Sequence, residues 1–532
     1  MKQSKTRSLP FQPSRSTTYS VAKPRAVVVG AGIAGIASAA RLARQGYQVT
    51  VLEKNAQPGG RCGQIVRDGH RFDVGATLFL MPEIFAETYA ALGQRMEDHL
   101  QLQRVDPTYN LTFADGTGLA LGGNLTALQP QLEALEAGSF AALLRYLQEG
   151  ERHYRLALRH FVGRNFTSLP GYLAPFNLWL IWRMKALRKH YANVSRYFKH
   201  PQLRAAFTFQ NMYLGLSPFD APATYSLLQY TEMVGGVWLP RGGMFRVVES
   251  LVDIAQSHGV RFHFRAPVQA ITVEGRRVSG VVLEDGTVLL ADVVVANADL
   301  PYVYEKLLPA GAAPRRLARM KYTSSTIMFY WALDQVYPQL QTHNIFLGGA
   351  EGTDYRASFE RIFHDHQLPQ DPSFYVHAPA RSDVTAAPAG ADTLMVLVPV
   401  GHLDPSAGQQ WNALQAQARS TVLGRLAAAG LPDLEAHLKF EISFTPRQWQ
   451  NIYNLARGAA FGLGHDVWQV GYLRPHNRCQ RYGNLFFTGS STHPGAGVPL
   501  ALLSARLTTE RILQATGAVR TIPMERHAYS AG

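Results

Sequence analysis

Residues 26–35 read AVVVGAGIAG, a β-branched run followed at once by the pattern Gly-x-Gly-x-x-Gly. The run predicts a strand, and the small residues over 36–45 predict the helix that follows it. Residues 47–52 predict a second strand, which closes on Glu53. Strand, glycine turn, helix and strand make a βαβ unit of the length that binds dinucleotides. The sequence therefore predicts an α/β domain with a parallel sheet near the N-terminus.

Each glycine of this turn has its own physical role. Gly30 permits the tight turn, Gly32 lets the backbone approach a pyrophosphate, and Gly35 lets the helix pack closely on the strand. The helix N-terminus, with Ile33 and Ala34, offers N–H groups and a positive dipole end to the phosphates. The alternative is a glycine-rich turn that holds no ligand.

The end of the second strand indicates which dinucleotide fits. A carboxylate at Glu53 can hold free ribose hydroxyls, which favours FAD or NAD over NADP. The turn that contains Gly60 and Arg61 favours FAD, because an arginine just after the second strand can reach the diphosphate of an extended cofactor. We also expect Lys54 and Val268 to contact FAD. The alternative for Arg61 is a solvated side chain on an ordinary β-turn.

A second glycine-rich stretch lies near the C-terminus, where residues 484–498 read NLFFTGSSTHPGAGV. A buried strand, a loop of small residues and a helix are expected in that order. Backbone N–H groups of such a loop can face the pyrimidine ring of a flavin and stabilise its reduced form. The expected contacts are Gly489, Gly495, Gly497 and Val498. His493 is a candidate acid or base, but a histidine beside a proline more often shapes the turn.

Composition excludes several classes of protein. The 532 residues are 46% hydrophobic and 17% charged, with a net charge of +14, and glycine and proline are spread along the chain. Collagen-like and low-complexity proteins are therefore excluded. The two cysteines, Cys62 and Cys479, are far apart, so we expect neither a disulfide framework nor a metal site, and a reducing compartment fits best.

The positive charge suits either a nucleic acid or an anionic membrane. No basic run with interleaved aromatic residues is present, so we expect no nucleic-acid partner. A peripheral membrane surface is favoured, on the cytoplasmic side, with a merely basic soluble surface as the alternative. No stretch approaches the ~20 apolar residues of a spanning helix. Residues 1–23 lack acids and an apolar core, which favours a disordered tail over a transit peptide and excludes a secretory signal.

One segment carries the features of a membrane-surface helix. Residues 178–182 read LWLIW, and four basic residues follow at Arg183, Lys185, Arg188 and Lys189. Tryptophan rings suit the membrane interface, and the cations suit anionic headgroups. The alternative is a buried helix whose basic end is solvated.

The motifs together resemble the bacterial and fungal phytoene desaturase family, and the fungal branch in particular. The resemblance covers about residues 25–514. It includes LRAAFTFQ at 203–210, SPFDAPATYSLLQY at 217–230, GVWLPRGG at 236–243 and FTP at 444–446.

The sequence departs from the family pattern at three places. Ser490 stands where relatives usually carry Ala, Gly or Cys, and residues 524–529 lack the hydrophobic C-terminal anchor of fungal relatives. Leu173 and Phe176 occupy the region where some bacterial relatives carry an Asp and an Arg. No catalytic acid or base is therefore assigned, and the catalytic residues stay unknown.

The resemblance implies an α/β fold like that of the flavin amine oxidases. It consists of a bipartite Rossmann-like FAD-binding domain, an inserted α+β substrate domain and a helical membrane-associating region. We expect tails over 1–24 and 516–532. FAD-binding parts are expected over 25–110, 241–300 and 446–515, the helical substrate and membrane region over 111–240, and the substrate sheet over 301–445.

The resemblance also implies a reaction, which is stepwise FAD-dependent desaturation of phytoene to lycopene or a related product. Hydride transfer to the flavin and loss of a proton would form each double bond, with quinone or oxygen as the final electron acceptor. An apolar isoprenoid offers no polar handle, so an apolar tunnel is expected. Trp238, Phe245 and Tyr225 are tunnel candidates, with core packing as the alternative. Glu232 is a candidate proton acceptor, with a structural carboxylate as the alternative.

Other functions remain open on the sequence. Within the same family they are a carotenoid isomerase, a later-pathway desaturase and a carotene oxygenase. From another class comes a non-enzymatic escort of prenylated proteins, of the GDP-dissociation-inhibitor type, which would need neither Glu53 nor the C-terminal loop. An amine oxidase would need an aromatic pair beside the flavin, which the sequence does not reveal.

Overall fold

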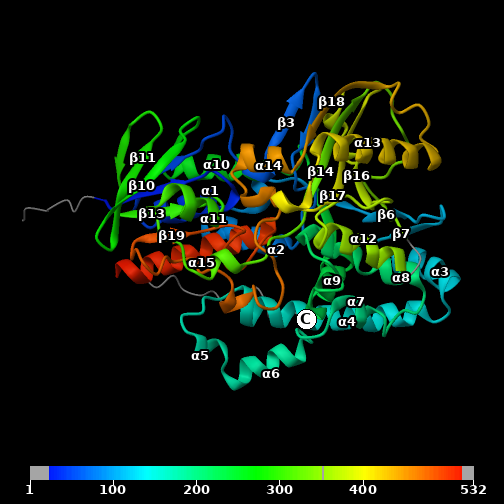
Figure 1. Cartoon of the computed structure of the whole chain (residues 1–532), viewed down its shortest axis with the longest axis horizontal. Helices are drawn as coiled ribbons and strands as arrows, with labels where there is room; N and C mark the ends of the chain where they lie inside the picture. The colour runs from blue at the N-terminus through cyan, green and yellow to red at the C-terminus, as the bar shows by residue number, and fades with distance from the viewer. Residues whose placement is uncertain (1–22, 350–352, 518–532) are drawn as a thin grey trace, which may run out of the picture.

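Five parallel strands carry the N-terminal glycine turn at their carboxyl ends in the computed structural model, which describes residues 23–349 and 353–517 (Figure 1). Their order is β19-β13-β1-β2-β9. The strands are β1 (Arg25–Val29), β2 (Gln48–Leu52), β9 (Arg261–His263), β13 (Val293–Ala296) and β19 (Leu485–Phe487). The predicted βαβ unit is confirmed, and segments that are far apart in the sequence complete its sheet.

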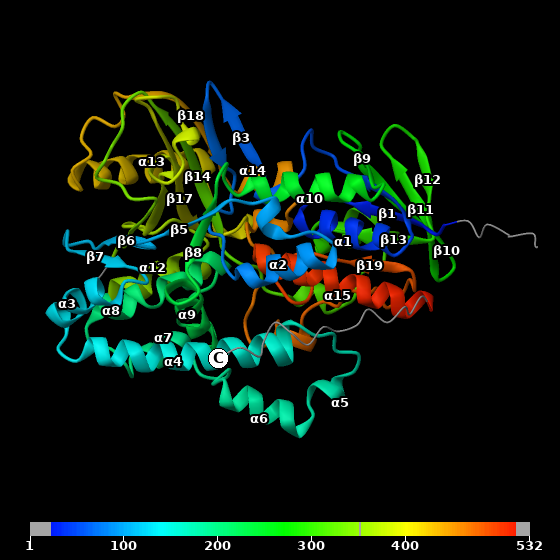
Figure 2. The same ribbon diagram turned by 180° about the vertical axis from the view of Figure 1, so that it is seen from behind.

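Both faces of this sheet are covered, since alternate residues of a strand point to opposite sides. Val28 and Val295 pack towards the helices on one face, and Val27 and Val294 pack towards strands on the other. The helices are α1 (Ile33–Arg44), α10 (Phe245–Ser257) and α15 (Val498–Thr516), and Figure 2 shows them side by side. The opposite face carries the antiparallel strands β10 (Val268–Glu274), β11 (Arg277–Leu283) and β12 (Val288–Leu290).

A second sheet has seven strands in the order β18-β14-β17-β16-β15-β6-β7. Its strands are β6 (Tyr109–Thr112), β7 (Gly118–Leu121), β14 (Ser325–Leu333), β15 (His343–Phe346), β16 (Phe374–His377), β17 (Asp392–Val400) and β18 (Leu438–Phe444). β6 pairs with β15. The start of the expected substrate and helical region, 111–240, therefore contributes strands to this sheet, a pairing between distant segments that leaves no local signal in the sequence. The domain boundaries stay predictions.

Helices form a layer below both sheets in the view of Figure 1. They are α3 (Leu125–Leu135), α4 (Ser139–Ala157), α5 (Leu169–Tyr172), α6 (Pro175–Arg183), α7 (His190–Val194), α8 (Pro201–Ala206) and α9 (Leu227–Met233). α5 and α6 project furthest from the rest of the molecule in both ribbon views. Within the described ranges, no helix is long and apolar enough to cross a membrane.

The remaining helices and strands complete the structure. They are α2 (Pro82–Ala91), α11 (Leu300–Tyr302), α12 (Thr353–Phe363), α13 (Trp411–Ala428), α14 (Pro446–Tyr453), β3 (Gln64–Arg67), β4 (His70–Asp73), β5 (Leu102–Val105) and β8 (Val237–Pro240). The tails expected before residue 24 and after residue 516 lie almost wholly outside the described residues.

Candidate functional site

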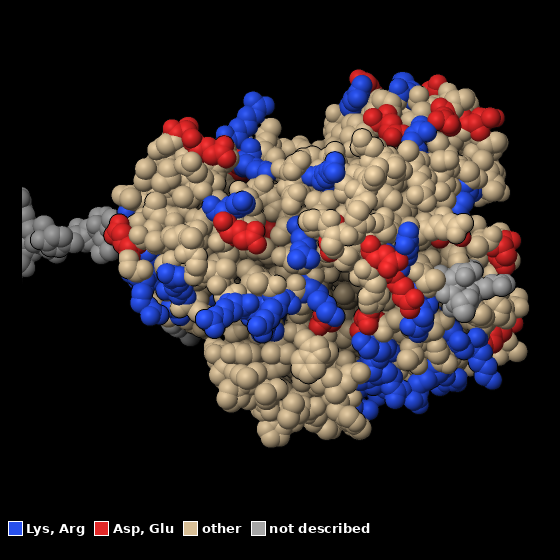
Figure 3. Space-filling view, viewed as in Figure 1, with Lys and Arg blue, Asp and Glu red and all other residues tan. Residues whose placement is uncertain are grey.

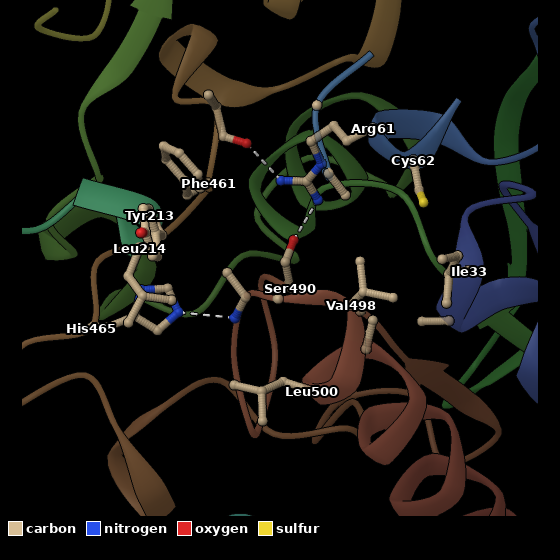
Figure 4. Close-up of a pocket in the computed structure, with 18 of the residues that line it drawn as sticks. Ile33, Arg61, Cys62, Tyr213, Leu214, Phe461, His465, Ser490, Val498 and Leu500 are labelled. Atoms are coloured by element: carbon tan, nitrogen blue, oxygen red, sulfur yellow. Dashed lines mark hydrogen bonds between the residues drawn. The ribbon is translucent and has the colours of Figure 1, made fainter. Parts of the chain in front are cut away.

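A cavity of about 730 Å³ begins at the carboxyl ends of the parallel strands and reaches both the seven-stranded sheet and the helical layer. Ligands of open α/β sheets bind at this end of the strands. Figure 4 shows part of the cavity, with Ile33 and Val498 on one side and Tyr213 and Phe461 on the other. The cavity therefore joins the two glycine-rich stretches to the interior of the rest of the molecule.

The glycine turn leaves the N-terminus of α1 free for a ligand. Gly32 caps α1 and has no side chain, so the capping residue supplies no acceptor for the first N–H groups of the helix. A Cβ on Gly32 would lie 2.6 Å from Nδ2 of Asn297, which donates to the Gly30 carbonyl. A Cβ on Gly35 would lie 2.2 Å from the Gly30 carbonyl oxygen. The turn can therefore form only with glycine at 35, and at 32 only glycine leaves the backbone accessible.

Glu53 is buried at the end of β2 and holds the turn in place. Its Oε2 accepts from the Ala31 N–H at 2.8 Å, and its Oε1 accepts from the Asn55 N–H at 2.9 Å. The carboxylate also lines the cavity. A carboxylate oxygen has more than one acceptor position, so Glu53 can still accept from a ribose hydroxyl.

Arg61 connects the first glycine-rich stretch to the C-terminal loop. Its Nη1 donates to the Ala460 carbonyl at 2.9 Å, and its Nη2 donates to Ser490 Oγ at 2.5 Å (Figure 4). Burial lowers the pKa of Arg61, and the nearby Asp299 carboxylate opposes that shift. The guanidinium is thus a fixed positive charge on the cavity wall, suited to an anionic group such as a diphosphate.

The buried Arg474 side chain holds the C-terminal loop in place through hydrogen bonds to its carbonyls. Arg474 has no exposed surface and donates only to carbonyls, including those of Gly464, Ser490 and Thr492. Nearby, Nε2 of His465 accepts from the Ala496 N–H at 2.9 Å (Figure 4). Burial lowers the pKa of Arg474 to about 10, so the side chain stays charged at neutral pH. This charge lies directly behind the loop that lines the cavity.

His493 lines the cavity but is already engaged. Its Nε2–H donates to the Arg164 carbonyl at 3.0 Å. Burial lowers its pKa to about 4, so the imidazole is neutral at physiological pH. The contact supports the interpretation that His493 shapes the turn.

Most of the residues that the sequence assigned to the cofactor line this one cavity. They are Gly30, Gly32, Ile33, Ala34, Glu53, Lys54, Gly60, Arg61, Val268, Gly489, Gly497 and Val498. Gly35 and Gly495 do not line it. Gly35 packs on Gly30, and a Cβ on Gly495 would lie 2.9 Å from Nε2 of His465. At both positions, a side chain would therefore clash with neighbouring atoms of the protein and would not extend into the cavity.

Lys54 lines the cavity with its ammonium engaged elsewhere. Nζ donates to the Asn451 carbonyl at 2.8 Å and to Asn454 Oδ1 at 2.7 Å. Lys54 therefore connects the end of β2 to the end of α14, and these two hydrogen bonds use two of the three donors of its ammonium.

Four residues at this site were not predicted from the sequence, namely Asn297, Asp299, His465 and Arg474. Asn297 and Asp299 follow β13, and their position at the carboxyl end of a buried strand is a usable signal. Asp299 lines the cavity and accepts from Ser491 Oγ. His465 and Arg474 carry no local signal, because only the tertiary fold brings them to the C-terminal loop.

Away from the glycine turns the cavity wall is mainly apolar. Its residues there include Leu158, Phe161, Ile181, Met184, Met212, Leu228, Ile345, Leu347, Phe374, Phe461 and Leu500. Of the three aromatic tunnel candidates, only Tyr225 lines the cavity. The prediction that Trp238 and Phe245 line the tunnel is wrong. Trp238 lies in β8, where it pairs with Phe79, and Phe245 is the first residue of α10. Aromatic character alone does not indicate whether a residue lines the cavity or packs in the core behind it.

Comparisons with known proteins agree with this geometry. Residues 33–513 match the family described as flavin containing amine oxidoreductase. The chain is 47% identical over 491 residues to the zeta-carotene-forming phytoene desaturase of Myxococcus xanthus, covering 92% of this chain and 94% of that protein. It is 40% identical over 517 residues to the phytoene desaturase of Fusarium fujikuroi, covering 93% and 90%. The bacterial relative is the more similar of these two.

The fold also matches a solved structure. Wild-type putrescine oxidase bound to putrescine superposes with a TM-score of 0.61 at 15% identity, covering 92% of this chain and 99% of that chain. This likeness shows the fold alone. It confirms a mixed α/β architecture like that of the flavin amine oxidases.

The residues present fit FAD, the expected cofactor. The uncapped start of α1 can receive a diphosphate, and Glu53 can receive a ribose. Arg61 places a partly buried positive charge on the same wall, and the C-terminal loop brings backbone N–H groups to it. Glycines 30, 32, 489 and 497 leave the space that a side chain would fill.

Proposed function

The chain belongs to the flavin containing amine oxidoreductase family, and on that premise we propose that it is an FAD-dependent carotenoid desaturase. Its substrate is phytoene or a close relative, converted stepwise to lycopene or a closely related product. One observation carries the proposal: a single cavity joins the dinucleotide turns to a long apolar wall. Bound FAD supplies a two-electron oxidant that accepts a hydride.

The apolar wall supports a hydrocarbon substrate. Leucine, isoleucine, methionine and phenylalanine side chains surround the part of the cavity away from Glu53 and Arg61. Burial of a hydrocarbon there is favourable by ~25 cal/mol per Å² of apolar surface, and no polar handle is required. The curated relatives are named for phytoene, and this supports the same class of substrate for this chain.

The proposal includes a peripheral membrane surface at α6, through which the substrate enters. Trp179 and Trp182 of α6 are 50% and 73% exposed, whereas Leu180 on its other face is buried. Ile181 and Met184, from the same segment, line the cavity. On the face that Figure 3 shows, no Lys, Arg, Asp or Glu is visible on the projecting part of the molecule at the lower edge, and Lys and Arg gather beside it. A lipid-facing helix that also lines the cavity supports direct uptake from the bilayer.

The basic residues at the end of α6 and just after it contribute unequally to this surface. Lys185 is ion-paired with the buried Glu149, and Lys189 lies 3.5 Å from Asp220. Arg183 and Arg188 are exposed and make no ion pair within the described part of the chain. We propose that these two arginines face anionic headgroups, whereas Lys185 has a structural role.

The relatives do not favour the alternatives considered on the sequence, which were a carotenoid isomerase, a later-pathway desaturase, a carotene oxygenase and a non-enzymatic escort. Quinone or oxygen remains the proposed electron acceptor.

The test is to incubate the FAD-loaded protein with phytoene in liposomes, with and without a quinone, and to record the product spectrum. We expect conjugated products whose amount exceeds the flavin only when an acceptor is present. Liposomes without phytoene are the control. A protein that holds FAD but neither reduces it with phytoene nor forms a conjugated product would contradict the proposal.

A further inference from the structure

A group of hydroxyls interrupts the apolar wall of the cavity. Thr77, Tyr213 and Tyr375 all line it. The Tyr375 hydroxyl is 2.9 Å from Thr77 Oγ1 and 2.8 Å from Nδ1 of His343. The Tyr213 hydroxyl has no close hydrogen-bond partner within the described chain, but the Tyr109 hydroxyl lies near enough to influence its pKa. A hydrocarbon offers these groups no partner, so hydrocarbon binding alone does not account for them.

Glu232 lies one layer of side chains behind this group. It belongs to α9, is 2% exposed and forms no ion pair in the part of the chain that the structure describes. Its Oε1 accepts from the Tyr109 hydroxyl at 3.1 Å. Two residues of the same helix, Leu228 and Thr231, reach the cavity wall. A buried carboxyl without a countercharge costs stability, which calls for a functional explanation.

Tyr109 connects Glu232 to the cavity. Its ring centre is 6.1 Å from that of Tyr213 and 5.4 Å from that of Phe209, and both of these residues line the cavity. Figure 4 shows Tyr213 across the cavity from Val498, at the C-terminal loop. The two tyrosine rings therefore lie between the carboxyl of Glu232 and the space that a substrate would occupy.

We propose that Glu232 takes up the proton that the substrate loses, by way of the hydroxyls of Tyr213 and Tyr109. This inference rests on the proposed desaturation. Each double bond requires the loss of a hydride from one carbon and a proton from its neighbour. The hydride, with two electrons, leaves to FAD. The proton passes to the oxygen of Tyr213, while Tyr213 gives its own proton to Tyr109 and Tyr109 gives its own to Oε1 of Glu232.

The surroundings of Glu232 give it a pKa suited to this role. Burial raises its pKa to about 8, although hydrogen bonds from Tyr109 and Gln210 oppose the shift. The titratable groups that act on it or respond to it are Tyr109, Tyr146 and Tyr213, and burial raises the pKa of each. These tyrosines stay neutral, so Glu232 is the one group of this set that changes charge near neutral pH. A general base works best with a pKa near the working pH.

The test follows flavin reduction in a single turnover without oxygen, with FAD-loaded protein and phytoene in liposomes, across pH. In the wild type we expect the rate to rise through about pH 8, as Glu232 ionises. Glu232→Gln should lower the rate ~10²-fold or more and abolish that dependence, with FAD content and liposome binding unchanged. Glu232→Asp should restore part of the rate.

A matched pair of variants separates this role from a structural one. Tyr109→Phe and Tyr197→Phe each remove a hydroxyl that donates to a buried carboxylate, Glu232 in one case and Glu149 in the other. Only the first should slow flavin reduction. A Glu232→Gln enzyme with the wild-type rate and pH profile would overturn the inference, as would equal rates for the two tyrosine variants. A wild type that phytoene does not reduce would instead overturn the proposed function itself.

Discussion

Arg61 donates to Ser490 across 2.5 Å and thereby joins two loops that are 429 positions apart in the chain. One loop follows β2 and the other follows β19, and both lie at the carboxyl-end edge of the five-stranded sheet, where β1 and β13 separate the two strands. The serine hydroxyl gives the Arg61 guanidinium a side-chain acceptor and orients it on the cavity wall.

Replacing this serine should weaken FAD binding moderately. Ser490→Ala removes the hydrogen-bond partner of Nη2 but leaves the bond from Nη1 to Ala460. We expect the Kd for FAD to rise ~3–10-fold, as for the loss of one hydrogen bond of ~1 kcal/mol. Fluorescence titration of the apoprotein measures it. Ser257→Ala, at the end of α10, is the control, and equal Kd values for the two variants would contradict the role of Ser490.

Enlarging Gly32 should abolish FAD binding. A Cβ there would lie 2.6 Å from Nδ2 of Asn297, and the remaining branches of a valine would occupy the space above the start of α1. We expect Gly32→Val to fold without flavin, as measured by absorbance and circular dichroism. Glu53→Ala should weaken FAD binding less, by ~1.5–3 kcal/mol.

The matched control for this variant is Gly424→Val, because a Cβ at Gly424 in α13 meets no atom within 4 Å. Stoichiometric flavin in folded Gly32→Val would show that the turn is not the diphosphate site.

Activity should depend on the backbone of the C-terminal loop more than on its histidine. Gly497 has φ +116° and ψ 145°, a conformation that a valine rarely adopts, so Gly497→Val should displace the loop and abolish activity. His493→Ala should keep measurable activity, because the imidazole donates to Arg164 and stays neutral. Phytoene consumption at equal flavin content is the measurement. The reverse ranking would make His493 a catalytic acid or base.

Membrane binding should depend on the exposed face of α6. Trp179→Glu with Trp182→Glu places two carboxylates on that face, so co-sedimentation with anionic liposomes should fall while FAD stays bound. Salt should also reduce binding of the wild type.

The control for this pair is Val66→Glu with Val384→Glu, which adds the same charge at side chains that are 66% and 81% exposed. Val66 belongs to β3, at the opposite edge of the molecule from α6 in Figure 1. If both double variants lose liposome binding equally, the loss results from the change in net charge and not from the position of α6. An insoluble, flavin-free α6 variant would favour a buried helix.

Stability should increase when Glu232 loses its charge. Burial raises its pKa from 4.5 to about 8, so the folded state holds a proton that the unfolded state releases between these values. The contribution of this carboxyl to stability is therefore lost as the pH rises from about 4.5 through about 8. At about pH 8.5, Glu232→Gln should raise the free energy of unfolding on the order of 1–3 kcal/mol. Denaturant unfolding across pH measures it, and the two proteins should converge near pH 4.5.

Glu149→Gln provides the contrasting case. Hydrogen bonds from Lys185 and Asn193 outweigh burial and lower the pKa of Glu149, so its charge stabilises the fold above the unfolded pKa. This variant should lose stability at alkaline pH. If both glutamine variants change the free energy of unfolding in the same direction, the charge of Glu232 does not destabilise the folded state.

Local pattern was enough to predict the parts of the site that rest on single elements. The run before Gly30, the three glycines and Glu53 predicted the βαβ unit, because strand propensity, turn geometry and helix dipole all act within a few residues. The stretch from Asn484 to Val498 predicted a strand, a loop and a helix for the same reason, and all three are present. FAD and the family followed from these motifs.

Only the tertiary structure decided how distant segments complete the site. Arg474 and His465 reach the C-terminal loop through hydrogen bonds to backbone groups, which leave no pattern in side-chain type. Trp238 and Tyr225 are both aromatic, yet only Tyr225 faces the cavity, because the side of the wall depends on the strands and helices packed behind each residue. Periodicity and propensity act over a few residues, whereas a cavity is formed by chain segments hundreds of positions apart, so its wall is determined by packing.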